Sequence, residues 1–308
     1  MQKPTFDPGL TQQFSGPLRR AINKDGSFNV RRRGATWRDF HPYLHLINMR
    51  WPQFLAVIFV SYLAVNTIFA LGYFALGADQ LQGAESPTEF GRFLNGFFFS
   101  AHTLTTVGYG SISPKGTASN ILAALEAMVG LMGFALGTGL LYGRVSRPSA
   151  RIGFSDRALI APYQDGMSLQ FRIVNQRPNM LMELEARVLL MTVEDAGQPK
   201  RNYKVLRLER EHVFFFPLTW TIVHPLDPEI PLWGKTAADL ERFQAEILIL
   251  ITGYDDTFSQ TVHARYSYRH DELVWGARFT PAFHIGADGD MMLEVDRVGA
   301  FTMGGALQ

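Results

Sequence analysis

Two long apolar stretches constrain the fold more than any other feature of the sequence. Residues 54–77 contain no charged side chain, and residues 120–143 contain a single one, Glu126. About 20 apolar residues in a helix cross the hydrocarbon core of a bilayer, whereas uncharged runs of this length are rare in soluble cores. We therefore expect two transmembrane helices, over about residues 54–77 and 120–144.

The positive charges around these stretches predict their orientation. Lys and Arg are frequent in residues 1–53 and directly after residue 143, whereas the connecting segment 78–119 carries only Arg92 and Lys115. Lys and Arg hold the ends of a span in the cytoplasm. We therefore expect a multi-pass protein of the cell (inner) membrane with both termini in the cytoplasm and no cleavable signal peptide.

Composition argues against several other classes of protein. The 29 Lys and Arg residues are balanced by 28 Asp and Glu residues, whereas a nucleic-acid-binding protein would show an excess of basic residues. The chain has no cysteine, which excludes disulfides, thiolate-bound metals and thiol catalysis. Among the eight histidines only His41 and His45 have an i, i+4 spacing, and no further ligand is near them. We expect no enzyme activity, no organic or metal cofactor and no nucleic-acid partner.

From residue 148 the sequence changes to short runs with alternating polarity. Turn signals such as Asp165-Gly166 and Asp288-Gly289 separate these runs. The runs cover residues 167–174, 184–193, 203–208, 218–223, 246–252, 261–268, 273–279 and 291–295. This pattern predicts an antiparallel β-sandwich or barrel, with one short helix near residues 237–243.

The segment between the two spans predicts an ion filter. Residues 95–105 are apolar but too few to cross a bilayer, which is typical of a re-entrant pore helix. The next five residues include two glycines, at 108 and 110, where a backbone with inward carbonyls needs positive φ. In a fourfold ring, such carbonyls replace the hydration shell of K⁺. The expected filter is Thr106, Val107, Gly108, Tyr109 and Gly110, with K⁺ bound at the first four.

Four motifs carry a resemblance to a known family. They are SAHTLTTVGYG at residues 100–110, Arg147-Pro148, TIVHPLD at residues 221–227 and LVWG at residues 273–276. Over roughly residues 30–300 the sequence resembles the inward-rectifier potassium channels, above all their prokaryotic members. The resemblance implies a homotetramer in which a membrane α-helical pore is joined to a C-terminal all-β, immunoglobulin-like cytoplasmic domain.

The same resemblance implies the division of the chain. It gives a cytoplasmic N-terminal segment (1–35), an interfacial slide helix (36–50), a transmembrane pore domain (51–147) and a cytoplasmic β-sandwich domain (148–308). In the slide helix, Asp39 is expected to cap the first turn and Pro42 to lie within it.

Gating residues are expected in the second span. The resemblance places the gate near Leu140, Leu141 and Tyr142, where four large side chains close a pore by dewetting, and we prefer Tyr142. The glycines of this span serve either close helix packing or a hinge. The resemblance also places Phe134 in the cavity, at the family's acidic position that senses polyamines and Mg²⁺. Block by these cations is implied by the resemblance, but Phe134 argues against strong voltage-dependent rectification.

The support of the filter differs from the family pattern. Many relatives pair a pore-helix Glu with an Arg after the filter, whereas this chain has His102 and then Ser111-Ile112. We expect Thr105 and His102 to support the filter. His102 is either a neutral packed side chain or a hydrogen-bond donor that makes conduction depend on pH. Glu126 either marks a functional site or pairs with the pore helix.

Two sets of charged residues are expected on the cytoplasmic side. A site for anionic lipids or phosphoinositides comprises Arg38, Arg50, Arg144, Arg147 and Arg151, although these residues also satisfy the positive-inside rule alone. The resemblance implies a cytoplasmic pore lined by Glu183, Asp255, Asp256 and Phe258, where a ring of carboxylates would concentrate cations. Two aspartates after a strand also fit a solvated turn.

Passive K⁺ conduction is the predicted function. Two alternatives remain open at this point. Altered support at His102 allows a non-selective cation channel. A membrane-anchored sensor, whose β domain binds a ligand and whose pore is vestigial, is the second alternative.

Overall fold

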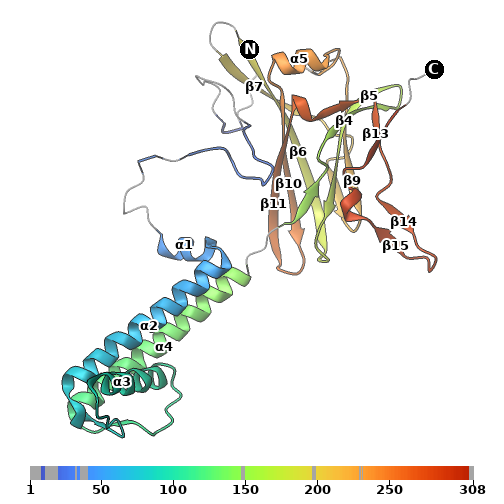
Figure 1. Cartoon of the computed structure of the whole chain (residues 1–308). Coiled ribbons are helices and arrows are strands. Elements are labelled where there is room, and N and C mark those ends of the chain that lie inside the picture. Colours follow the sequence, from blue (N-terminus) through green and yellow to red (C-terminus); the bar gives the residue numbers. More distant parts are fainter. Residues whose placement is uncertain are drawn as a thin grey trace. The chain divides into compact units, whose positions relative to one another are not determined.

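The computed structural model describes residues 8–10, 20–31, 33–34, 41–146, 150–195, 199–228, 230 and 232–304. The chain divides into two compact units, residues 33–147 and residues 1–32 together with 148–308. The first unit is helical and the second is built from β-strands (Figure 1).

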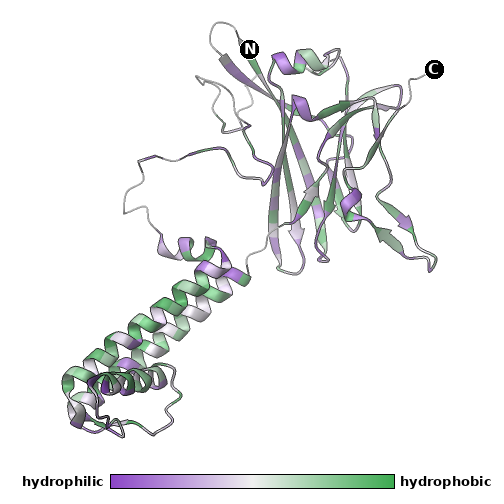
Figure 2. Cartoon of the chain, viewed as in Figure 1, coloured by the Kyte–Doolittle hydropathy of each residue, from purple (hydrophilic) through white to green (hydrophobic). Residues whose placement is uncertain are grey.

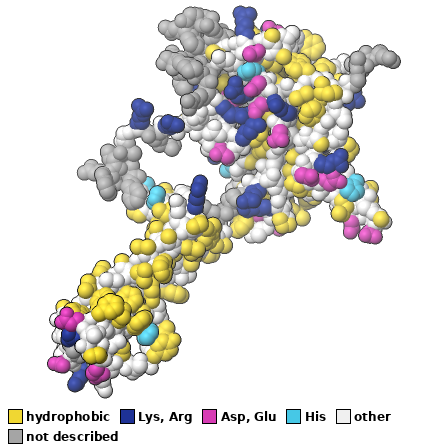
Figure 3. Space-filling model, viewed as in Figure 1, with side chains coloured by type: hydrophobic (Ala, Val, Ile, Leu, Met, Phe, Trp, Pro, Cys, Tyr) yellow, Lys and Arg dark blue, Asp and Glu magenta, His cyan; other side chains and the backbone are white. Residues whose placement is uncertain are grey.

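Two long helices dominate the helical unit. They are α2 (Trp51–Leu76) and α4 (Thr117–Val145), and both are long and apolar enough to cross a membrane. Hydrophobic residues are spread around both helices rather than along one stripe (Figure 2), and apolar side chains cover much of their visible surface (Figure 3). A helix that is apolar all round needs an apolar environment on every side. Few of these side chains are buried within the chain, so lipid or other copies of the chain must cover the rest.

Two shorter helices complete this unit. The helix α1 (Pro42–Asn48) precedes α2 and has its proline in the first turn, where the missing N–H costs no hydrogen bond. The helix α3 (Glu89–Leu104) contacts both α2 and α4. It begins earlier than the expected residue 95 because Thr88 caps it, with Thr88 Oγ1 accepting a hydrogen bond of 3.1 Å from the Gly91 amide. Its polar first turn lies outside the apolar run from which the sequence prediction was made.

Two short strands pair with each other at the two ends of the segment between α2 and α4. After the 3₁₀ turn η2 (Ala78–Gln80), strand β1 (Leu81–Gln82) pairs antiparallel with β2 (Ser113–Pro114). The α3 helix and the residues after it therefore form a loop whose two ends are hydrogen-bonded together.

Two five-stranded sheets form the β unit. One sheet has the order β12-β4-β5-β3, with β9 also paired to β5, and the other has the order β11-β10-β6-β7, with β8 paired to β6. The strands of the first are β3 (Ile152–Phe154), β4 (Ala158–Tyr163), β5 (Gly166–Asn175), β9 (Thr219–Pro225) and β12 (Leu273–Trp275). Those of the second are β6 (Leu181–Asp195), β7 (Pro199–Leu206), β8 (His212–Phe215), β10 (Glu246–Asp255) and β11 (Gln260–Arg269).

The smaller elements lie between and after these strands. They are helix α5 (Ala237–Arg242), the 3₁₀ turns η3 (His270–Glu272) and η4 (Val295–Arg297), and the pairs β13 (Ala277–Phe279) with β16 (Phe301–Met303) and β14 (Phe283–Ile285) with β15 (Met291–Leu293).

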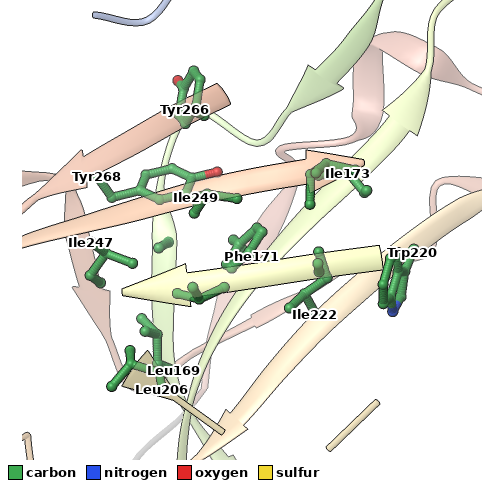
Figure 4. Close-up of a cluster of buried hydrophobic side chains, with 14 of the residues drawn as sticks. Leu169, Phe171, Ile173, Leu206, Trp220, Ile222, Ile247, Ile249, Tyr266 and Tyr268 are labelled. Atoms are coloured by element: carbon green, nitrogen blue, oxygen red, sulfur yellow. The ribbon is translucent and has the colours of Figure 1, made fainter. Parts of the chain in front are cut away.

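Alternate residues of the two sheets build the core. Leu169, Phe171 and Ile173 of β5 are buried in the same cluster as Ile247 and Ile249 of β10 (Figure 4). This period of two is what the alternating sequence pattern predicts for strands with one buried face. The prediction of a β-sandwich after residue 148 is thus confirmed.

A stretch of the N-terminal segment packs on the β unit. Ile22 is buried beside Met191, Tyr203 and Leu248. The Ala21 amide donates hydrogen bonds of 3.0 Å to the Glu246 carboxylate. These contacts join the segment to strands that follow it by more than 150 residues, which the sequence alone did not indicate.

Candidate ion-conduction site

The backbone of residues 106–110 alternates in handedness. Thr106, Gly108 and Gly110 have φ of 59°, 54° and 80°, whereas Val107 and Tyr109 between them have negative φ. In an extended strand successive carbonyls point to opposite sides, and this alternation instead turns them toward one side. Glycine adopts positive φ without strain, but Thr106 does so at a cost of about 1 kcal/mol. A row of carbonyls along one side of the backbone can replace the water around a bare cation.

The end of α3 holds the start of this backbone. The His102 carbonyl accepts hydrogen bonds from the amides of Val107 (2.9 Å) and Gly108 (3.2 Å), and the Thr103 carbonyl accepts one from Thr106 (3.0 Å). Carbonyls in the last turn of a helix have no partner within the helix. Here they receive the filter amides, so the helix and the filter form one hydrogen-bonded piece.

Both residues predicted to support the filter lie next to it. The His102 ring packs edge-on against the Tyr109 ring, with centroids 4.8 Å apart. The Thr105 hydroxyl donates a 2.6 Å hydrogen bond to the Ala101 carbonyl within the same helix end. His102 thus contacts the filter through its backbone carbonyl and its ring. Of the two alternatives for His102, a packed side chain or a pH-sensitive hydrogen-bond donor, this geometry fits the packed side chain. Its role in filter support stays a prediction.

Comparison with known proteins identifies the family. Residues 152–301 match the model for the inward rectifier potassium channel C-terminal domain, and residues 56–145 match an ion channel model. The inward rectifier potassium channel Kirbac3.1 of Paramagnetospirillum magnetotacticum is 36% identical over 94% of this chain and 98% of its own length. The chain belongs to the inward-rectifier potassium channel family. Two human relatives, G protein-activated inward rectifier potassium channels 2 and 3, are 26% and 27% identical over 91% and 89% of this chain and 70% and 76% of their own lengths.

Membership of this family confirms four predictions from the sequence. The resemblance to prokaryotic inward rectifiers is confirmed, and so is the fold class, in which membrane helices precede a β-rich C-terminal domain. The channel is a membrane protein, and because its relatives are potassium channels it is not an enzyme. Within the described residues, no group of three or more His, Asp or Glu side chains could hold a metal ion.

The face of α4 that carries the predicted gate is exposed in the single chain. Phe134 and Tyr142 are 76% and 73% exposed, and their spacing of eight residues keeps them on one broad face of the helix. Leu140 is half-buried and is turned away from this face, whereas Leu141, seven residues from Phe134, shares the face but is only 39% exposed. The gate assignment stays a prediction, and this geometry favours Tyr142 among the three candidates.

One arginine of the predicted lipid site has an intramolecular role. Arg144 donates hydrogen bonds to the carbonyls of Leu46 (2.7 Å), Ile47 (2.8 Å) and Met49 (2.7 Å), at the end of α1. Arg50 and Arg151 are exposed, in the helical and the β unit respectively. Arg38 and Arg147 lie outside the described residues. The lipid site stays a prediction. Because Arg144 already donates three hydrogen bonds within the chain, it has fewer N–H donors left for a lipid headgroup than its sequence position suggested.

The structure corrects the assignment of Asp255 to the cytoplasmic pore. Asp255 is fully buried. Its Oδ1 accepts from the amides of Thr257 (3.0 Å) and Phe258 (3.3 Å), and its Oδ2 accepts from Asn179 Nδ2 (2.8 Å). A carboxylate with these partners stabilises the turn between β10 and β11 and cannot line an aqueous vestibule.

The other members of that predicted set remain accessible. Asp256 and Glu183 are exposed, and Phe258 is half-buried in the turn. Glu183 has φ of 50° beside the register shift between β6 and β10, where a β-bulge re-aims a side chain. These three residues stay candidates for the cytoplasmic pore.

Proposed function

We propose that four copies of this chain form a pore that conducts K⁺ passively through residues 106–110. Carbonyls of Thr106, Val107, Gly108 and Tyr109 would bind the ion. The alternating sign of φ from Thr106 to Gly110 carries the proposal, because it turns successive carbonyls to one side. The three relatives described above are named as inward rectifier potassium channels, which supports the choice of ion.

The need for four copies follows from what one chain leaves uncovered. Val107 and Tyr109 are exposed, and so is most of the apolar surface of α2 and α4. One filter strand supplies a quarter of each ring of carbonyls that an ion requires. A homotetramer closes the ring and covers the helix faces that do not meet lipid.

The positions of charge suggest how conduction is controlled. With both termini in the cytoplasm, the exposed Arg50 and Arg151, together with Arg38 and Arg147, would meet anionic lipids or phosphoinositides. A ring of Tyr142 side chains would close the pore by dewetting. Phe134 offers no charge to polyamines or Mg²⁺, so block by these cations and the resulting rectification should be weak.

Rubidium uptake into liposomes tests this function. Purified protein is reconstituted with and without anionic lipid, and radioactive Rb⁺ uptake is driven by a K⁺ or a Na⁺ gradient, with Ba²⁺ as blocker. We expect Ba²⁺-sensitive uptake with K⁺ and not with Na⁺. Gly108→Ala places a side chain at positive φ and should abolish uptake, whereas Gly166→Ala, at an exposed position with nothing within 4 Å, should not.

Other outcomes would favour the two alternative functions. Uptake with both gradients would indicate a non-selective cation pore. Absence of uptake in every lipid, with Gly108→Ala indistinguishable from the unmodified protein, would favour a membrane-anchored sensor.

A further inference from the structure

Four buried polar side chains are linked inside the helical unit. Glu126 of α4, Ser100 of α3 and Asn66 of α2 are fully buried, and Tyr73 of α2 is almost so. The Tyr73 hydroxyl lies 2.6 Å from one carboxyl oxygen of Glu126, and Ser100 Oγ contacts the other oxygen. Ser100 Oγ also lies 3.0 Å from Asn66 Oδ1. The linked side chains join the pore helix to both membrane helices.

The orientation of the Asn66 amide follows from its other partner. Asn66 Nδ2 lies 2.7 Å from the carbonyl oxygen of Tyr62. A carbonyl oxygen only accepts hydrogen bonds, so the amide nitrogen must face it and the amide oxygen must face Ser100. Asn66 therefore supplies no proton to its contact with Ser100.

The remaining contacts require one proton more than the hydroxyls provide. Three oxygen-to-oxygen contacts, Tyr73 to Glu126, Glu126 to Ser100 and Ser100 to Asn66, need three protons. The two hydroxyl groups carry one proton each, and an ionised carboxylate carries none. With Glu126 ionised, one contact would join two acceptors at a site without exposed surface, which is unfavourable in any apolar setting.

We propose that Glu126 is a neutral carboxylic acid that donates its proton to Ser100, and that this chain of hydrogen bonds positions the pore helix for ion selectivity. Ser100 then donates to Asn66, and Tyr73 donates to Glu126. Every contact has one proton, and no uncompensated charge lies within the membrane. The assignment also resolves the two sequence-based alternatives for Glu126, since pairing with the pore helix is itself the functional role.

The link to selectivity runs through α3. Ser100 lies two residues before His102 in this helix. The His102 carbonyl accepts hydrogen bonds from the Val107 and Gly108 amides. A shift of the helix at Ser100 therefore moves the backbone that surrounds the ion. This part of the inference rests on the proposed function, because it makes Glu126 and Ser100 positioning residues for K⁺ selectivity.

Infrared spectroscopy tests the protonation directly. We expect the wild-type protein at neutral pH to show the carbonyl stretch of a protonated carboxylic acid, and Glu126→Gln to lack it. Glu85→Gln is the matched control, because Glu85 is an exposed carboxylate in the segment that leads to α3, and the band should persist in it. Absence of the band from the wild-type protein, or its persistence in Glu126→Gln, would overturn the protonation assignment.

Rubidium and sodium flux test the positioning role. The amide of Glu126→Gln accepts from Tyr73 and donates to Ser100 as the neutral acid does, so the ratio of Rb⁺ to Na⁺ flux should stay within about twofold of wild type. Ser100→Ala and Glu126→Ala remove the link and should lower the ratio by about tenfold. A tenfold loss in Glu126→Gln, or a folded Ser100→Ala or Glu126→Ala with unchanged selectivity, would refute the positioning role.

The two measurements separate this inference from the proposed function. A wild-type protein that shows the acid band but passes no Rb⁺ would contradict the proposed function and the positioning role, and would leave the protonation of Glu126 established. If neither alanine variant folds, a tenfold loss of selectivity in Glu126→Gln would still refute the positioning role, because that variant preserves every contact.

Discussion

The guanidinium carbon of Arg144 lies 4.7 Å from the centre of the Trp51 ring. The same group lies 4.5 Å from the Phe54 ring and donates three hydrogen bonds to carbonyls at the end of α1. The last turn of α4, the end of α1 and the start of α2 are therefore held by one side chain. A lysine ammonium also has three donors, but all are on one nitrogen, and it lacks the planar group that packs against both rings while it donates from two nitrogens.

Replacing Arg144 should loosen α1. In Arg144→Lys and Arg144→Ala, amide hydrogen exchange in residues 42–48 should accelerate by about tenfold or more, since charge-assisted hydrogen bonds contribute about 1.5–3 kcal/mol each. Arg50→Ala removes a nearby exposed charge and serves as the control. Equal exchange in the Arg144 and Arg50 variants, measured in detergent, would contradict the anchoring role.

Gly130 should not tolerate a side chain, because its helix meets the end of the pore helix there. A Cβ at Gly130 would lie 2.1 Å from the Leu104 carbonyl oxygen, whereas one at Gly137 would have no neighbour within 4 Å in the chain. Gly130→Ala should therefore cost about 1–3 kcal/mol and lower the melting temperature and yield of the protein. Gly137→Ala, the control, should leave the fold intact and stiffen a candidate hinge. Similar melting curves for both variants would exclude close packing at Gly130.

The two adjacent aspartates at the β10–β11 turn, Asp255 and Asp256, should differ sharply in how much each contributes to the free energy of unfolding. Asp255→Asn turns an amide NH₂ toward either the Asn179 amide or the turn amides, all of them donors, and should cost about 1–3 kcal/mol. Asp256→Asn changes an exposed side chain and should cost less than about 0.5 kcal/mol. Thermal unfolding of the full-length protein measures both. The assignment of Asp255 to the turn fails if Asp256→Asn proves the more destabilising.

Acidification should release the N-terminal segment from the β unit. Burial alone would raise the pKa of Glu272, but hydrogen bonds from the Arg269 amide, Lys24 and Arg20 hold that pKa below its ordinary value. The ionised form therefore stabilises docking, which is fully present above the unfolded glutamate pKa of about 4.3 and is lost as the pH falls through the lower folded value.

A spin label can follow this release because the chain has no cysteine of its own. On Asn29→Cys, an exposed position in the docked segment, label mobility should rise as the pH falls below about 4. Adding Glu272→Gln should give a mobile label already at neutral pH. An immobile label in that double variant would show that Glu272 does not hold the segment.

The size of the side chain at position 142 should set the leak through the closed pore. Tyr142 is 73% exposed on α4, whereas Leu140 is half-buried. Tyr142→Ala should therefore raise basal Rb⁺ uptake, because a wider apolar ring no longer dewets. Leu140→Ala should change it much less. The reverse order would move the gate to Leu140.

Local patterns predicted much of the architecture. Uncharged runs indicated both membrane helices, and alternation indicated the long strands β5, β6, β10 and β11. The strands β3, β8, β14 and β16, of three or four residues each, were not predicted, because so short a stretch carries no readable period. Strand β4 (Ala158–Tyr163) was missed as well, because its first four residues are all buried and show no alternation. The start of α3 was missed for a related reason, since the Thr88 cap and the first turn are polar.

The sequence by itself determined which segments enter the membrane, which residues can hold a backbone with inward carbonyls, and the family to which the chain belongs. Hydrophobicity, glycine placement and motif composition are local properties, so they can be read along the chain. Only the tertiary structure decided that Asp255 is buried against Asn179, that Arg144 holds α1, and that Glu126 meets Ser100 and Tyr73. Each of these roles depends on a partner 26 to 98 residues away, and only folding decides which distant groups share a buried site and which remain in water.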